Sequence, residues 1–150
     1  MALSPTSVAT AVAGLSVSGV TVKDLTGVPE EVFDRDCPIV YPNPANYVSM
    51  GGVSRETMGG DSGALKEVRY TLHYLFLHHE AGAERGQKDA AQDAVSKLYA
   101  FISAVIANCD ALTVIDITPD HGPLQVVQDP SGKDFHGCEV SLTVTEWLNA

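Results

Sequence analysis

Basic residues are scarce in this sequence, and their scarcity excludes one large class of function. The 150 residues include nine Lys or Arg and nineteen Asp or Glu, which gives a formal net charge of −10 and a pI near 4.7. A protein that binds DNA or RNA tightly gathers Lys and Arg so that several phosphates are neutralised together. Here the basic residues are spread singly along the chain. We therefore expect no tightly held nucleic acid.

Long apolar runs are also missing. Ser, Thr, Asp or His interrupts every apolar stretch well before the ~20 residues that a transmembrane helix needs. Residues 1–15 have no Lys or Arg ahead of their apolar part, unlike a secretory signal. We expect a soluble chain, made inside the cell, with no membrane partner.

Cysteines are few and widely separated. Cys37, Cys109 and Cys138 include no Cys-x-x-Cys pair of the kind that binds zinc or forms a redox couple. We interpret them as buried free thiols in a reducing compartment.

No arrangement typical of an enzyme is present. The glycine-rich phosphate loops are missing, and Ser62 lies in a glycine-rich stretch without completing the Gly-x-Ser-x-Gly nucleophile motif. His73, His78, His79 and Glu80 are of the residue types that bind zinc or iron. Successive residues of a strand point to opposite faces, however, so we expect His78 and His79 not to share a metal ion. The sequence therefore predicts no catalytic residue, no cofactor and no metal site.

Hydrophobic periodicity predicts the secondary structure. A long strand is expected over 66–79, where apolar and polar residues alternate, and a long helix over 84–108, where apolar residues recur at helical spacing. A shorter helix is expected over 4–14, because proline at position 5 suits a first helical turn. Further strands are expected over 17–25, 37–41, 112–118, 124–128 and 135–148.

These elements predict an α+β fold. Short turns join the last three strands, which makes them antiparallel neighbours. We expect one domain over residues 1–150, a two-layer sandwich in which a mostly antiparallel sheet of about four to five strands is packed by the N-terminal helix and the long helix. Leu75 and Leu77 interrupt the polar alternation of the long strand. That end of the strand is therefore expected to be covered on both faces.

Residues 42–63 are predicted to form a long extended loop. They hold five glycines and two prolines and show no sustained apolar period. So little apolar surface does not offset the ~1–2 kcal/mol per residue that backbone ordering costs. We therefore expect the loop to order only against a neighbouring subunit or another protein partner. Tyr47, Met50 and Met58 are its candidate interface residues. Trp147, on the otherwise polar face of the last strand, is either a further interface anchor or a cover for the protein's own core.

The order of these predicted elements can be compared with the order of elements in a known family. An N-terminal helix is followed by a short strand at 37–42, a long amphipathic strand at 69–77, a helix at 89–106, a closing hairpin and a C-terminal strand at 139–144. This order resembles that of the tail terminator, or tail completion, proteins of long-tailed bacteriophages. The resemblance spans nearly the whole chain and rests on pattern and order.

The resemblance implies a structural virion protein that is not an enzyme. Such proteins form a hexameric ring on the last ring of tail-tube subunits, end tube polymerisation and offer their other face to the head connector. The implied partners are further copies of the chain, the tail tube protein, and the head-tail connector or head completion protein, in a phage neck assembled in the host cytoplasm. DNA would pass through without specific binding, and an acidic surface fits this passage because it repels phosphate.

Two other functions stay open. A different phage neck or minor tail protein, such as a head-tail joining or head completion protein, would share the composition and the order of elements. Ring stoichiometry and position along the tail would distinguish it. The other is a small soluble enzyme with an unrecognised site, which bound metal or turnover of a substrate would reveal.

Overall fold

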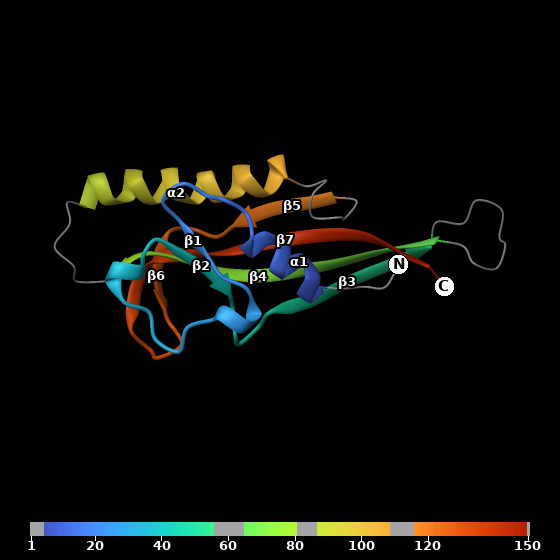
Figure 1. Cartoon of the computed structure of the whole chain (residues 1–150), viewed down its shortest axis with the longest axis horizontal. Helices are drawn as coiled ribbons and strands as arrows, with labels where there is room; N and C mark the ends of the chain where they lie inside the picture. Colours follow the sequence, from blue (N-terminus) through green and yellow to red (C-terminus); the bar gives the residue numbers. More distant parts are fainter. Residues whose placement is uncertain (1–4, 56–64, 81–86, 109–115, 150) are drawn as a thin grey trace.

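Two α-helices and one seven-stranded sheet make up the described part of the chain. The structure is a computed structural model of the full sequence and describes residues 5–55, 65–80, 87–108 and 116–149 (Figure 1). Helix α1 spans Pro5–Ala13 and helix α2 spans Gln87–Ala107. The α+β class, the N-terminal helix and the long helix expected from the sequence are confirmed, and the sheet has seven strands where four to five were expected.

The sheet is built around its two longest strands. Its order is β1-β2-β4-β7-β5, with β3 also beside β4 and β6 also beside β7. Only the pair β1 and β2 is parallel, and all other pairs are antiparallel. The strands are β1 (Thr21–Val22), β2 (Ile39–Pro42), β3 (Val48–Arg55), β4 (Leu65–Glu80), β5 (Asp116–His121), β6 (Gln125–Gln128) and β7 (Asp134–Asn149).

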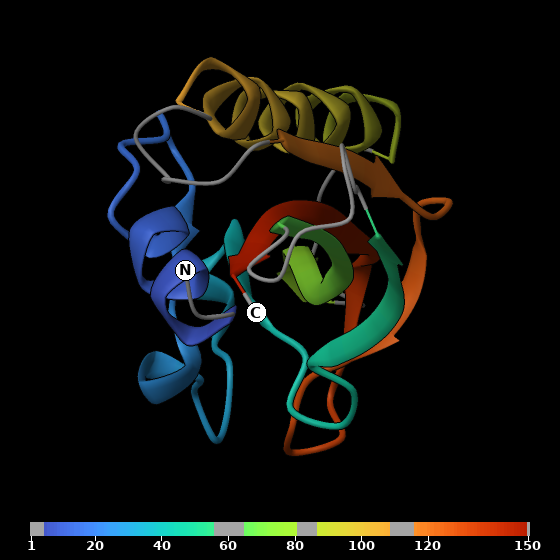
Figure 2. The ribbon, with the colours of Figure 1, turned by 90° about the vertical axis from the view of Figure 1, so that its right-hand side faces the viewer.

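One face of the sheet carries the main core. Because β4 and β7 pair in register, with Leu72 opposite Leu142, their alternating apolar residues meet on the same face. Both helices pack there, α2 above the central strands and α1 beside them (Figure 2). Burying each large side chain stabilises the fold by ~1.5–3 kcal/mol. The core includes Val8, Val12, Leu98, Phe101 and Val105 from the helices, and Tyr70, Leu72, Tyr74, Phe76, Val140, Leu142 and Val144 from the strands.

A second, smaller core covers the opposite face at one end of β4. Leu75 and Leu77 are buried there, so the expectation that both faces of this end are covered is confirmed. The cover comes from the chain itself and consists of Val32, Ile39, Tyr41 and Phe135, with Val28, Cys37 and Val127 packed around them.

The predicted loop at 42–63 is wrong over residues 48–55. Val48–Arg55 form β3, which pairs with the first half of β4. The register shifts between Met50 and Val53, where Gly51 and Gly52 lie, so the two glycines interrupt the alternation that would have marked a strand. The long strand β4 offers backbone partners that override this weak local pattern. Residues 56–63 of the predicted loop lie outside the described residues.

Candidate assembly surfaces

The structure places the four predicted interface residues differently. Tyr47 is half-buried and packs against the chain's own main core, because the pairing of β3 draws it onto the sheet. Burial raises the pKa of Tyr47 to about 12. Met50 and Trp147 lie on β3 and β7, with side chains outside what the structure describes, and Met58 lies outside the described residues altogether. The structure therefore brings none of them together on a described surface.

A different surface carries the exposed apolar side chains. Among the described residues, six large apolar side chains are exposed, by between 40% and 57%, and five of them belong to α2 or to the segment that follows β5. We call these five, together with β5 itself, the β5 edge surface. The five are Val95, Tyr99, Ile106, Leu124 and Val126.

Helix α2 and strand β5 form a continuous part of this surface. Figure 1 shows α2 running directly above β5, and the end-on view agrees (Figure 2). The Nδ1–H of His121 donates to the carbonyl of Gly122 at 2.8 Å, which leaves Nε2 to accept from the hydroxyl of Tyr99 at 3.2 Å. The two rings meet edge to face, 5.7 Å apart. The helix is thus tied to the end of the strand.

The β5 edge surface is open, and its apolar part is nearly uncharged, since its carboxylates Asp116 and Asp120 lie on β5 itself. No described strand pairs with β5 on the side away from β7. From Ala94 to Asn108 the only charged residue is Lys97, and residues 122–128 carry no charge. Apolar, charge-poor patches of this kind on a soluble protein mark binding sites for other proteins.

The opposite edge of the sheet holds a basic cleft. We call it the β1 cleft: a cavity of about 410 Å³ whose lining includes Thr21 and Lys23 beside β2. Its lining also includes Arg35, which lies on residues 28–37, the covering segment of the smaller core. Lys23 and Arg35 are both exposed. The stem of Lys23 passes close to Gly27, where an added Cβ would lie 3.5 Å from its Cδ. The guanidinium of Arg35 lies 4.6 Å from the ring centroid of Phe33.

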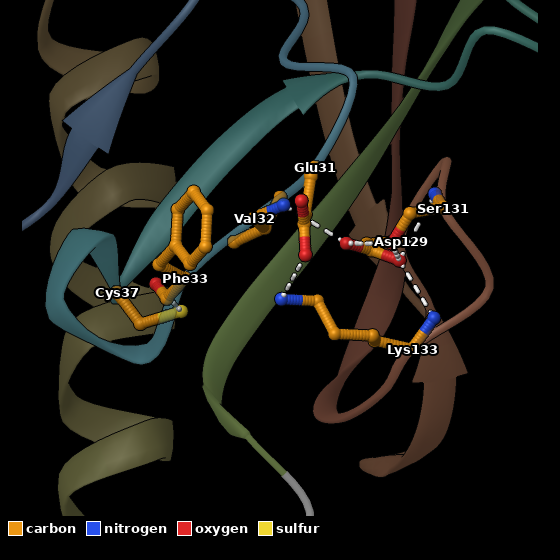
Figure 3. A network of polar contacts seen from close by, with 7 residues as sticks. All are labelled: Glu31, Val32, Phe33, Cys37, Asp129, Ser131 and Lys133. Atoms are coloured by element: carbon orange, nitrogen blue, oxygen red, sulfur yellow. Dashed lines mark hydrogen bonds and ion pairs between the residues drawn. The ribbon is translucent and has the colours of Figure 1, made fainter.

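A buried carboxylate fixes the wall of the β1 cleft (Figure 3). Asp129 is 4% exposed. Its Oδ2 accepts from the backbone N–H of Val32 at 2.9 Å, and its Oδ1 accepts from the N–H groups of Ser131 at 3.1 Å and Lys133 at 2.8 Å. Burial alone would raise the pKa of Asp129, but these hydrogen bonds outweigh it and hold the pKa below its usual value. The carboxylate thereby joins the covering segment to the turn between β6 and β7.

The same junction places two cations near the ring of Phe33. The ammonium of Lys133 lies 2.9 Å from Glu31 Oε1 and 4.6 Å from the centroid of Phe33. Figure 3 shows Lys133 reaching across from the β6–β7 turn to the covering segment. With Arg35 also at the Phe33 ring, the covering segment meets the turn through apolar, ionic and cation–π contacts together. Arg35 therefore lies on a segment that is tied to the β6–β7 turn at Glu31, Val32 and Phe33.

The histidines at the end of β4 differ from expectation. The register of β4 shifts between Leu77 and His79, and this bulge turns the rings of His78 and His79 toward one another, with their Nδ1 atoms 2.7 Å apart. The prediction that they point to opposite faces is therefore wrong. His78, which is 1% exposed, contacts Asp93 Oδ2 through Nε2 at 2.6 Å, and His79 stacks on His136 with centroids 4.7 Å apart. The cluster joins β4 to α2.

The described cysteines are thiols. Cys138 is buried, and burial raises its pKa to about 11. Cys37 is partly buried beside the β1 cleft, with its Sγ 3.7 Å from the carbonyl of Phe33. Cys109 lies outside the described residues.

Within the described ranges, no three His, Cys, Asp or Glu side chains are placed to hold a metal ion. None of the helices in that part of the chain is long and apolar enough to cross a membrane. Compared with models of known protein families and with curated proteins, the chain matches none. The surfaces and the order of elements are therefore what bears on function.

Proposed function

We propose that this chain is a structural virion protein that assembles with its own copies into a ring at the head-proximal end of a bacteriophage tail. The ring ends polymerisation of the tail tube and joins the tail to the head connector. The order of elements supports the phage assignment, and the β5 edge surface supports assembly as the mode of action.

The observation that carries the proposal is the second apolar stripe of α2. Val95, Tyr99 and Ile106 are spaced four and seven residues apart, which places them on one face of the helix, while the residues that pack on the sheet occupy another. A helix that is apolar beyond its core-facing stripe buries the remainder against a partner. Here the extra stripe lies beside an open strand edge, where a neighbouring subunit can reach both.

The scarcity of charge on α2 and on the segment after β5 favours a further copy of the same chain as the partner. Two copies that each carry −10 repel one another over most of their surfaces. Residues 94–108 and 122–128 together hold one charged residue, so contact through this region brings few like charges together. A strongly basic partner would instead be recognised by a surface dense in Asp and Glu.

Electron microscopy and native mass spectrometry of the purified chain test the proposal. We expect rings of one defined stoichiometry, and we expect the Val95→Asp/Ile106→Asp variant to be monomeric with an unchanged circular dichroism spectrum, because both side chains are exposed and their loss leaves the core intact. Ser96→Asp is the matched control, since Ser96 is exposed on α2 but lies away from the stripe. It should still form rings.

Tail tubes distinguish this function from its alternatives. Added during polymerisation of tail tube protein, the wild-type ring should be found at one end of the tubes and should shorten them, and the double variant should do neither. A ring that binds the connector but leaves tube length unchanged would point to a head-tail joining protein. A chain that stays monomeric at every concentration tested would contradict the proposal.

A further inference from the structure

The two ends of the sheet are chemically different. Strands β1 and β5 are the terminal strands of its order, and no described strand lies beyond either of them. The β1 end carries the cations Lys23 and Arg35, and the β5 end carries the carboxylates Asp116 and Asp120. All four side chains are exposed, and none of them forms an ion pair with another described residue.

These charges also project from the same face of the sheet. Thr21 lies opposite Ile39, which belongs to the smaller core, so Thr21 and, two residues on, Lys23 point to that face. On β5, Ile117 is buried in the main core. Asp116 and Asp120 are one and three residues away from it, so they point to the opposite face of the sheet, the face of the smaller core. If two sheets lie edge to edge in the same orientation, side chains of one face meet across the joint.

The environment of the cleft favours an acidic occupant. Asp24 is engaged within its own turn, where it accepts from the N–H of Gly27 and the hydroxyl of Thr26, both at 2.9 Å. The hydrogen bond from Thr26, followed by that from Gly27, lowers its pKa. Asp36 is the one carboxylate that lines the cleft beside Lys23 and Arg35. Two exposed cations thus line this cleft in a chain that is otherwise strongly acidic.

We infer that Lys23 and Arg35 of one copy bind Asp116 and Asp120 of the next copy, so that the β1 cleft receives the β5 edge in a head-to-tail contact. This inference rests on the proposed ring and adds which two surfaces meet in it. A contact between different surfaces of identical chains repeats by rotation, and it closes into a ring when the rotation divides a full turn. The apolar stripe of α2 supplies affinity at the same joint, whereas exposed ion pairs chiefly set partner choice and register.

Charge reversal with compensation tests the contact. One variant, Lys23→Glu/Arg35→Glu, has two acidic edges, and the other, Asp116→Lys/Asp120→Lys, has two basic edges. Each alone should remain monomeric at concentrations where the wild type forms rings. Mixed in equal amounts, they should form rings in which the two variants alternate, detected by native mass spectrometry from their different masses. A chain with all four changes should form rings by itself.

Controls separate this inference from the proposed function. Asp134→Lys/Glu139→Lys makes the same change in net charge as Asp116→Lys/Asp120→Lys, at exposed positions of β7, and should leave assembly intact. Circular dichroism establishes that each variant is folded. If either two-charge variant forms rings as readily as the wild type, or if neither the mixture nor the four-charge chain recovers them, the contact is wrong while the ring itself stands. Failure of the wild type to form rings would remove the proposed function as well.

Discussion

Replacing Asp129 by Asn should destabilise the subunit far more than a surface substitution does, because no orientation of the amide satisfies the donors around it. Asn has one acceptor oxygen and one NH₂ group. With the oxygen at the Oδ1 position, the NH₂ group faces the backbone N–H of Val32, and with the oxygen at the Oδ2 position it faces those of Ser131 and Lys133. Either way, at least one buried N–H loses its acceptor and meets another donor.

The size of the effect follows from these contacts. A hydrogen bond to a charged acceptor contributes ~1.5–3 kcal/mol, and an unsatisfied buried donor costs ~1–3 kcal/mol. The N–H of Val32 is buried, whereas the turn that holds Ser131 is exposed to water, so the loss at Val32 dominates. We expect a decrease of about 2–4 kcal/mol in the free energy of unfolding, which corresponds to roughly 5–15 °C in melting temperature for a chain of this size.

Urea and thermal unfolding followed by circular dichroism measure this difference. The substitution is best made in the monomeric Val95→Asp/Ile106→Asp background, because dissociation of a ring would otherwise add to the apparent stability. Asp134→Asn, at the start of β7 beside the same turn, is the control. Asp134 is exposed and accepts one hydrogen bond, from Gln128 Nε2 at 3.2 Å, so its loss should cost less than about 0.5 kcal/mol.

The pH dependence gives an independent check on Asp129. Its pKa is lowered in the folded chain, so its contribution is fully present above the ordinary aspartate pKa of about 3.9 and is lost as the pH falls through the lower folded value. The stability difference between the parent chain and Asp129→Asn should therefore narrow only below about pH 4. Equal stability of Asp129→Asn and Asp134→Asn at pH 7 would show that the carboxylate does not hold the covering segment.

Two further substitutions, each compared with a matched control, test the sheet. Gly137→Ala should cost at least about 3 kcal/mol and reduce the soluble yield, because a Cβ there runs into the carbonyl of Phe76 on β4, whereas Gly122→Ala, whose added Cβ would have no atom nearer than 3.9 Å, should be nearly neutral. Tyr70→Phe should cost ~1–3 kcal/mol in urea unfolding, because it leaves the buried carboxylate of Glu146 without the hydroxyl 3.0 Å away. Tyr74→Phe should be neutral or slightly stabilising, since its buried hydroxyl has no hydrogen-bond partner among the described residues, and a cost equal to that of Tyr70→Phe would contradict this reasoning.

Local periodicity was sufficient to predict the elements with the strongest patterns. The alternation in β4 and β7 and the helical spacing in α2 are each sustained over many residues. Leu75 and Leu77, which are apolar where the alternation would place polar residues, correctly indicate a second covered face. Strand β3 was missed because its two glycines carry no side chain to show the alternation. The bulge at His78 was missed because a shift of register has no marker in the strand's own sequence.

The candidate surfaces depend on pairings between distant parts of the chain. The bond between Val32 and Asp129 joins residues 97 positions apart, and nothing in either local pattern indicates it. Which strands become the open edges follows from the pairing of β4 with β7, a long-range choice of the same kind. The second apolar stripe on α2 can be predicted from the sequence alone. Val95, Tyr99 and Ile106 make the apolar face of the helix wider than the face that packs on the sheet.

The chemistry of the β5 edge bears on why a ring of limited size would form rather than an open aggregate. An exposed strand edge invites any other strand to pair with it, and proteins block such pairing with proline and charge. Strand β5 has Pro119 between Asp116 and Asp120, so two copies that met β5 to β5 would bring four carboxylates together and lack a backbone donor at each proline. The symmetric dimer is thereby disfavoured, and the basic β1 cleft becomes the complementary partner. In the proposed assembly, the same three residues that protect the edge in the free subunit would select head-to-tail contact, and head-to-tail contact is the kind that closes a ring.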